Sequence, residues 1–288
     1  MLAASIALTS ILFLVPPAWA LEVEPDGVEM LPPGTTIALL YLQHAERNAL
    51  YSGGHRRPGS PRLNSDLVVY RLVHSVGLAE GISWDAQVVM PTGRLKAAGT
   101  ASALGEAHGV GYTMIGGPLK FRVNGNDIIM IGPYLLLPTG SYDRSSQLNM
   151  GENRWSLVLQ LGYARRLSPK WSANFIGDAH FYRRNNDFRT DGASLLSQRP
   201  RYEPQIALRY AVTPQTELAL GAGWIIGGRT KVGGVAQDDR LNTVYGRATI
   251  THFLRPELPV QLQLGRDLRV SSGFKEDWRM NVRLGLIF

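Results

Sequence analysis

The sequence predicts an all-β protein, an antiparallel up-and-down transmembrane β-barrel of about 12 strands. Three observations lead to this fold class. Segments of 10–15 residues alternate apolar and polar side chains, which is the period of a strand. Their connections alternate between short turns and long polar loops. Charged residues make up only 18% of the chain, below the roughly 25% usual for soluble domains, while glycine is abundant at 31 residues.

The first 20 residues, MLAASIALTSILFLVPPAWA, form an apolar run that ends in the small residues Ala18 and Ala20 around Trp19. This pattern is typical of a secretory signal peptide cleaved after Ala20. The alternative, an N-terminal membrane anchor, is disfavoured because about 12 apolar residues are too few to span a bilayer. We therefore expect residues 1–20 to be a signal peptide, residues 21–34 a short periplasmic segment and residues 35–288 the barrel.

The alternation is clearest at the C-terminus. In residues 277–288 one face is wholly apolar, and it comprises Trp278, Met280, Val282, Leu284, Leu286 and Phe288. Residues 153–167, 201–212 and 216–224 alternate in the same way. In contrast, the predicted strands 35–46, 109–122 and 126–138 are apolar on both faces, so the pattern does not assign their inward and outward sides.

The pattern predicts strands at 35–46, 64–76, 81–91, 109–122, 126–138, 152–167, 171–182, 201–212, 216–227, 242–254, 259–268 and 277–288. Turns of three or four residues make up five of the eleven connections, at 77–80, 123–125, 168–170, 213–215 and 255–258. Longer loops lie between them, at 47–63, 92–108, 139–151, 183–200, 228–241 and 269–276. In outer-membrane barrels short turns face the periplasm and long loops the exterior.

A closed sheet is the β-structure that can cross a bilayer, because lipid offers no hydrogen bonds to unpaired backbone groups. A soluble β-sandwich or lipocalin-like barrel also alternates, but soluble strands average about 5–6 residues. The tryptophans favour the membrane barrel, since four of them lie near strand ends where an interfacial aromatic belt is expected: Trp155, Trp171, Trp224 and Trp278.

Three segments carry a family resemblance: Leu31-Pro32-Pro33-Gly34 before the first strand, the run from Leu137 to Asp143 (LPTGSYD), and the run from Met150 to Trp155 (MGENRW). Together with residues 228–235 they resemble the family of outer-membrane transporters associated with the meta-pathway of phenol degradation. The resemblance covers most of residues 31–288. It implies a channel for the passive uptake of small aromatic or hydrophobic solutes, without catalytic residues. Only residues 21–34 precede the first strand, too few for the N-terminal plug of long-chain fatty-acid transporters.

Alternation assigns a set of polar side chains to the lumen, where they either line a narrow pore or pair with one another and hold the barrel rigid. The candidate pore-lining residues are Asn174, Asp178, His180, Glu203, Arg209, Glu217, Arg247, Arg279 and Arg283. The six histidines show no ligand spacing on a shared face, and no cysteine is present, so we expect neither a metal site nor another cofactor.

The expected partners follow from the membrane location. They are outer-membrane lipid and lipopolysaccharide, whose phosphates suit the loop sequence His55-Arg56-Arg57, and a small-molecule solute, but not nucleic acid. The apolar C-terminal strand ending in Phe288 is a further expected contact, for the barrel-assembly machinery.

Two other classes of protein also fit a barrel of this size. One is a structural or adhesion barrel that conducts no solute. The other is an outer-membrane lipid hydrolase with a Ser-His-Asn arrangement, which we disfavour because His252 is the only outward histidine near a strand end and no serine motif flanks it.

Overall fold

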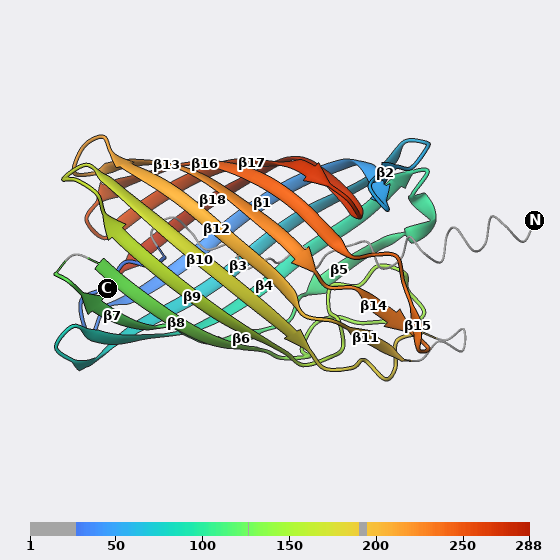
Figure 1. Ribbon diagram of the computed structural model, residues 1–288, viewed down its shortest axis with the longest axis horizontal. Helices are drawn as coiled ribbons and strands as arrows, with labels where there is room; N and C mark the ends of the chain where they lie inside the picture. Colours follow the sequence, from blue (N-terminus) through green and yellow to red (C-terminus); the bar gives the residue numbers. More distant parts are fainter. Residues whose placement is uncertain (1–26, 126, 190–194) are drawn as a thin grey trace, which may run out of the picture.

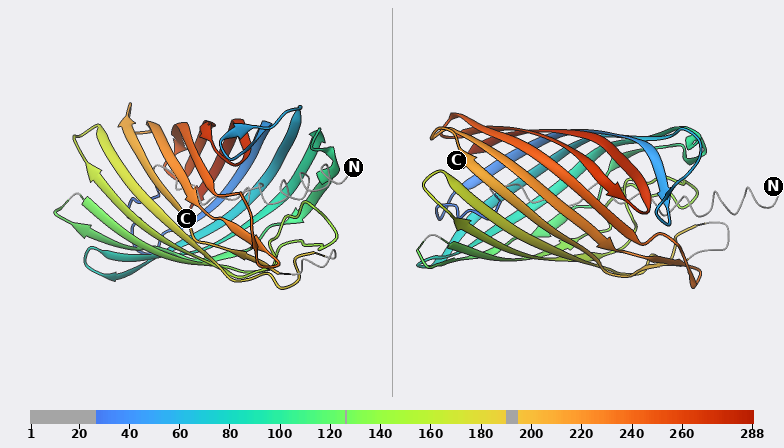
Figure 2. Two further views of the ribbon diagram at one scale, coloured as in Figure 1. Left: turned by 45° about the vertical axis from the view of Figure 1, so that its right-hand side comes forward. Right: turned by 45° about the horizontal axis from the view of Figure 1, so that its top comes forward.

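A computed structural model describes residues 27–125, 127–189 and 195–288. The predicted signal peptide lies outside these residues. The chain forms one closed antiparallel barrel, whose strands are strongly tilted to the barrel axis (Figures 1 and 2). The last strand pairs with the first over Ile37–Tyr51 and Gly273–Ile287, which closes the sheet. No helix in the described part of the chain is long and apolar enough to cross a membrane.

The prediction of a 12-stranded up-and-down barrel is confirmed. Eleven positions in the wall are single strands, each paired with its sequence neighbour. They are β1 (Thr36–Ser52), β3 (Pro61–Ala79), β4 (Ile82–Gly99), β8 (Asp127–Leu136), β9 (Ser156–Arg166), β10 (Trp171–Tyr182), β12 (Arg201–Ala211), β13 (Thr216–Gly227), β16 (Leu241–Arg255), β17 (Leu258–Val270) and β18 (Gly273–Ile287).

The twelfth position is a composite, and here the predicted single strand 109–122 is wrong. It consists of β5 (Glu106–Val110), β6 (Met114–Gly116) and β7 (Leu119–Val123), with breaks at 111–113 and 117–118. All three pieces pair with β4, but only β6 and β7 pair with β8. The second break coincides with Gly117 and Pro118, and proline has no N–H for the ladder.

Several strands extend beyond their predicted ends on the long-loop side. β4 continues to Gly99, well into the predicted loop 92–108, and β1 and β18 extend into the predicted loops 47–63 and 269–276. Within the loops, β2 (His55–Arg56) pairs with β1, η1 (Ser102–Leu104) is a single 3₁₀ turn, and β11 (Leu196–Gln198), β14 (Thr230–Val232) and β15 (Val235–Ala236) form a small separate sheet. The barrel is therefore taller at this end than a membrane crossing requires.

The inward and outward faces in the C-terminal half agree with the alternation. On β18, Trp278, Met280 and Leu284 are exposed on the outer surface, whereas Arg283 is buried inside. Exposed apolar side chains also lie on the outside of all the remaining long strands, for example Leu72 of β3 and Leu220 of β13. This outer surface suits lipid, which is the environment where exposed apolar side chains cost nothing.

Candidate functional site: the barrel lumen

The polar side chains that the sequence assigns to the lumen all lie on the inner face of the barrel. They come from β10, β12, β13, β16 and β18 and are buried or half-buried. The set comprises Asn174, Asp178, His180, Glu203, Arg209, Glu217, Arg247, Arg279 and Arg283. Their placement inside the barrel agrees with the alternation, and their role in lining a pore stays a prediction.

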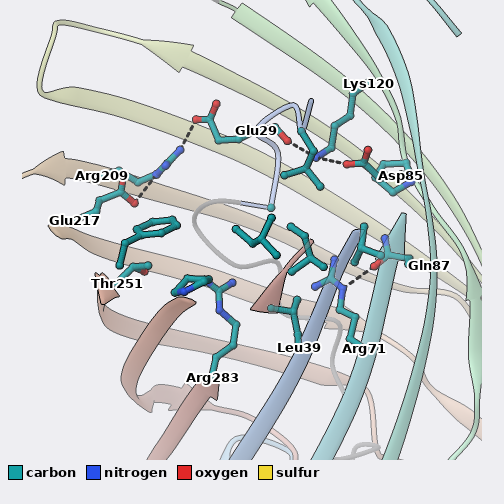
Figure 3. Close-up of a pocket in the computed structure, with 18 of the residues that line it drawn as sticks. Glu29, Leu39, Arg71, Asp85, Gln87, Lys120, Arg209, Glu217, Thr251 and Arg283 are labelled. Atoms are coloured by element: carbon teal, nitrogen blue, oxygen red, sulfur yellow. Dashed lines mark hydrogen bonds and ion pairs between the residues drawn. The ribbon is translucent and has the colours of Figure 1, made fainter. Parts of the chain in front are cut away.

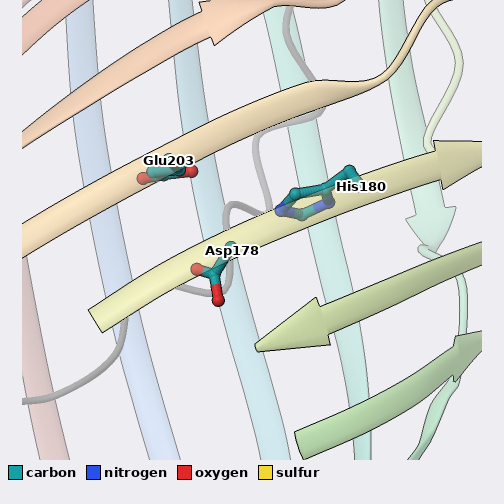
Figure 4. A group of neighbouring side chains, drawn as sticks. All are labelled: Asp178, His180 and Glu203. Atoms are coloured by element: carbon teal, nitrogen blue, oxygen red, sulfur yellow. The ribbon is translucent and has the colours of Figure 1, made fainter. Parts of the chain in front are cut away.

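Asp178, His180 and Glu203 gather at one place on neighbouring strands (Figure 4). Asp178 accepts hydrogen bonds from the side chains of Gln160 (2.8 Å) and Gln205 (3.1 Å). Glu203 accepts one from the hydroxyl of Tyr245 at 2.8 Å. These hydrogen bonds run along the wall, between side chains of adjacent or next-but-one strands.

Their ligand atoms lie within 4.8 Å of one another, close enough to share a cation. No local pattern predicts this grouping, because it depends on the register of β10 against β12. Arg201 lies in the same place, 3.0 Å from Nε2 of His180 and 3.8 Å from Glu203. Its guanidinium supplies positive charge beside His180 and Glu203, so we describe the cluster as an internal network of ion pairs and hydrogen bonds.

A second charged cluster lies nearer the long loops and centres on Glu276 of β18. Its carboxylate accepts hydrogen bonds from Arg47 (2.8 Å), Arg279 (2.9 Å) and Arg247 (3.3 Å). Asp267 accepts the backbone N–H of Glu276 at 2.8 Å. The sequence analysis missed Glu276 and Arg47 because it assigned both to loops, so that no alternation was applied to them.

The described residues before β1, from Gly27 onward, enter the barrel, whereas the sequence pattern predicts a periplasmic segment over 21–34. Val28 is fully buried against Ile128, Met130 and Ile176 on the inner wall. A Cβ on Gly162 would come within 2.7 Å of the side chain of Met130, so the absence of a side chain there leaves room for Met130, which packs with Val28. Apolar burial is thus one reason why this short segment stays in the lumen.

Glu29 is the polar anchor of the same segment (Figure 3). Its backbone carbonyl accepts a hydrogen bond from Lys120, and its carboxylate pairs with Arg209. Both cations also have acidic partners on the wall, since Lys120 lies 2.8 Å from Asp85 and Arg209 lies 2.8 Å from Glu217. The N-terminal segment, Gly27 to Leu31, is therefore held from both sides of the barrel.

A cavity of about 340 Å³ lies beside this segment, at the short-turn end of the lumen (Figure 3). Three of the predicted site residues line it: Arg209, Glu217 and Arg283. The others of the predicted set do not. Apolar side chains such as Leu39 and Val73 form part of its wall, and Arg71 donates a 2.6 Å hydrogen bond to Gln87 there. The cavity is large enough for a small organic molecule.

The long-loop end of the lumen is filled differently. The loop between β8 and β9 folds inward and buries Leu148 and Met150 in an apolar cluster with side chains of the surrounding wall. The wall side chains of this cluster are Leu50, Leu63, Leu67, Leu95, Ala97, Ala101, Leu104, Ala107 and Phe274. The predicted strand 126–138, apolar on both faces, is not part of this cluster, because its inner side chains Ile128 and Met130 pack with Val28 instead.

The β8–β9 loop is fixed by Tyr142, which belongs to the LPTGSYD run. Its hydroxyl donates a 2.7 Å hydrogen bond to the backbone carbonyl of Phe188, and it accepts one from the side chain of Asn185 at 3.0 Å. Burial raises the pKa of Tyr142, so its hydroxyl keeps the proton that it donates. The close contact of Gly140 with Gly151 brings the two ends of the loop together.

The chain matches one protein family over most of its length. The profile of the family described as "Putative MetA-pathway of phenol degradation" matches residues 47–284. The chain belongs to this family. The resemblance found in the sequence is thereby confirmed. No match is found among curated protein sequences.

A solved structure of an outer-membrane channel from Pseudomonas putida F1 agrees with this assignment. It shares 41% sequence identity with this chain at a TM-score of 0.91, and the alignment covers 93% of this chain and all of the other. The barrel therefore lies in the bacterial outer membrane, with its short turns toward the periplasm.

Two more distant structures share the fold alone. The NanC porin has 9% identity and a TM-score of 0.51 over 86% of this chain and 98% of its own. The transport unit of the autotransporter AIDA-I from Escherichia coli has 10% identity and a TM-score of 0.54 over 99% of this chain and 97% of its own. These two likenesses are to the barrel and not to a particular solute.

Proposed function

We propose that this protein is an outer-membrane channel for the passive uptake of small hydrophobic solutes, aromatic compounds among them. The observation that carries the proposal is the apolar cluster around Leu148 and Met150 at the extracellular end of the lumen. Channels for ions and sugars have polar, water-filled interiors. An interior lined with leucine and methionine disfavours water and charged solutes and favours solutes that are themselves apolar.

The paired charges further inside fit the same function. Asp178, Glu203 and Glu276 all have basic or amide partners on the barrel wall, so they present no unpaired charge to a passing ion. An apolar solute that leaves the apolar cluster next meets the cavity beside Glu29, whose wall is part apolar. The narrow lumen is consistent with flux of small molecules only.

Growth measurements test the proposal. A strain that lacks this protein should grow more slowly than its parent on a limiting aromatic carbon source, and the difference should disappear at high concentration. The reason is that passive flux scales with the concentration gradient, so a lost channel matters most when the solute is scarce. Plasmid-borne protein should restore growth.

A substitution within the apolar cluster links the phenotype to the lumen. Leu148→Asp places a charge in the path and should fail to restore growth, whereas the volume-conserving Leu148→Met should restore it. Equal growth of the deletion strain and its parent on several aromatic solutes, together with no conductance of the purified protein, would instead favour a structural barrel.

We also propose that the C-terminal strand is the contact for the barrel-assembly machinery. Phe288 is exposed on the outer surface, and its backbone bonds with that of Thr36 at 2.8 and 2.9 Å close the barrel. Phe288→Asp should sharply lower the amount of folded protein in the outer membrane, because it puts a charge on the apolar face.

The matched control is Ile287→Asn on the inner side, where Ile287 lines the cavity. Folded protein is measured by its faster gel migration before boiling. Equal losses from both substitutions would contradict a specific role of Phe288.

A further inference from the structure

In the described part of the wall, the pairing is short where the composite strand meets β4 and β8, with three residues of β6 paired on each side. β6 has three residues and is bounded by the breaks at 111–113 and 117–118. Prolines surround it: Pro91 on β4, Pro118 in the second break and Pro133 on β8. Each proline removes a backbone donor from the ladder, and proline is otherwise confined to edge strands and bulges. The pairing that holds β6 in the wall is therefore unusually short.

This weak point lies within the lipid-facing band. The five residues of β7 separate Gly117–Pro118 from the periplasmic turn, which at ~3.3 Å per residue and ~45° tilt is roughly 12 Å. One backbone bond joins the break to each neighbouring strand, from Gly117 N–H to the Pro133 carbonyl at 3.2 Å and from Asp85 N–H to the Pro118 carbonyl at 3.0 Å. The side chain of Trp84 donates a further hydrogen bond to the Gly117 carbonyl at 3.2 Å. Irregular backbone at this depth is tolerated where it borders protein or a cavity, and not against lipid.

A cavity lies on each side of the wall at this point. The outer one, about 610 Å³, opens on the lipid-facing surface among Leu72, Trp84, Val88, Ile115, Leu135 and Leu157. Gln87 and Tyr134 line this outer cavity and also the lumen cavity beside Glu29. Their side chains form a 3.0 Å hydrogen bond. This pair of side chains therefore borders both cavities, and beside it Gly116 lines the outer cavity while Pro118 lines the inner one.

We propose that the break at Gly117–Pro118 is a lateral exit, through which apolar solutes pass from the lumen into the lipid of the membrane when β6 moves away from a neighbouring strand. This inference rests on the proposed function and adds the route. An apolar solute gains by this path, because it leaves the lumen cavity for lipid and avoids the charged contacts of Glu29 with Lys120 and Arg209 that close the periplasmic end.

Disulfide staples test the route, and the chain contains no cysteine that would interfere. Ile115 lies opposite Val88 of β4 and opposite Leu135 of β8. Directly opposite residues have Cα atoms about 4.5–5.5 Å apart, within the range that a disulfide bridges. The variants V88C/I115C and I115C/L135C therefore fix β6 to one neighbour each. The matched control, L208C/L220C, staples a lipid-facing pair in the regular ladder between β12 and β13.

The readout is the rate at which cells take up N-phenyl-1-naphthylamine, an apolar aromatic probe that fluoresces in lipid, with potassium conductance of the purified protein alongside. After the barrel has assembled, disulfide formation in at least one of the two β6 variants should lower the uptake rate to that of the deletion strain. Reduction of the disulfide should restore the wild-type uptake rate. Potassium conductance should not change, and the control staple should have no effect on either measurement.

Wild-type uptake by both oxidised β6 variants, with the staples verified, would overturn the lateral exit while leaving the channel itself intact. If wild-type cells take up the probe no faster than the deletion strain, the proposed function fails as well. Leu135→Trp, which fills the outer cavity without a staple, should slow uptake in the same way. Leu208→Trp on the regular wall is its control.

Discussion

Deleting residues 27–31 should raise the single-channel conductance several-fold, because these residues occupy the lumen at its periplasmic end. Val28 packs on the inner wall, and Glu29 is bound by Lys120 and Arg209. Without the segment, the space that it fills joins the cavity of about 340 Å³ next to it. Conductance of the purified protein in planar bilayers measures the change.

The milder variant Glu29→Gln separates the two anchors. It removes the ion pair with Arg209 but keeps the hydrogen bond that the backbone carbonyl accepts from Lys120, so we expect a smaller rise or more frequent opening. Val28→Ala tests the apolar anchor by itself. Unchanged conductance after the deletion would show that the inward β8–β9 loop, and not the N-terminal segment, limits the flow.

Replacing Glu276 by glutamine should destabilise the barrel by about 3–5 kcal/mol, the usual cost of removing one partner from a buried ion pair. Glu276 is buried and accepts hydrogen bonds from Arg47, Arg247 and Arg279. When Glu276 has no charge, the nearby carboxylate that remains for these three arginines is that of Asp267. Their positive charges are then poorly compensated, which destabilises the folded barrel. The midpoint of urea unfolding, followed by gel migration without boiling, measures the loss.

Glu46→Gln is the matched control. The Glu46 carboxylate is half-exposed and lies 3.5 Å from His44, an interaction worth about 0–1 kcal/mol at a surface. Replacing Arg47 together with Glu276 by uncharged residues should recover part of the stability, because one of the unpaired cations is removed with its partner. Similar midpoints for Glu276→Gln and Glu46→Gln would mean that water reaches the Glu276 cluster.

The sequence was most informative where the two faces of a strand differ in polarity. On β18 the alternation placed Trp278 and Leu284 outside and Arg283 inside, and it placed Asp178 and His180 inside on β10. It failed for residues 109–122, where the composite strand is interrupted, and for Arg47 and Glu276, which lie in strands that continue past the membrane. The alternation of apolar and polar residues predicts the part of a strand that crosses lipid. It does not predict the part of a strand that continues beyond the membrane into water.

The sequence by itself determined the strand number, the order of short turns and long loops, and the family, because each of these depends on local patterns that lipid imposes. The tertiary structure decided what occupies the lumen. Val28 and Met150 are each one apolar residue in an irregular segment, and only the folded barrel shows that both insert into it. Contacts between segments far apart in the chain depend on strand register and closure, which no local pattern encodes.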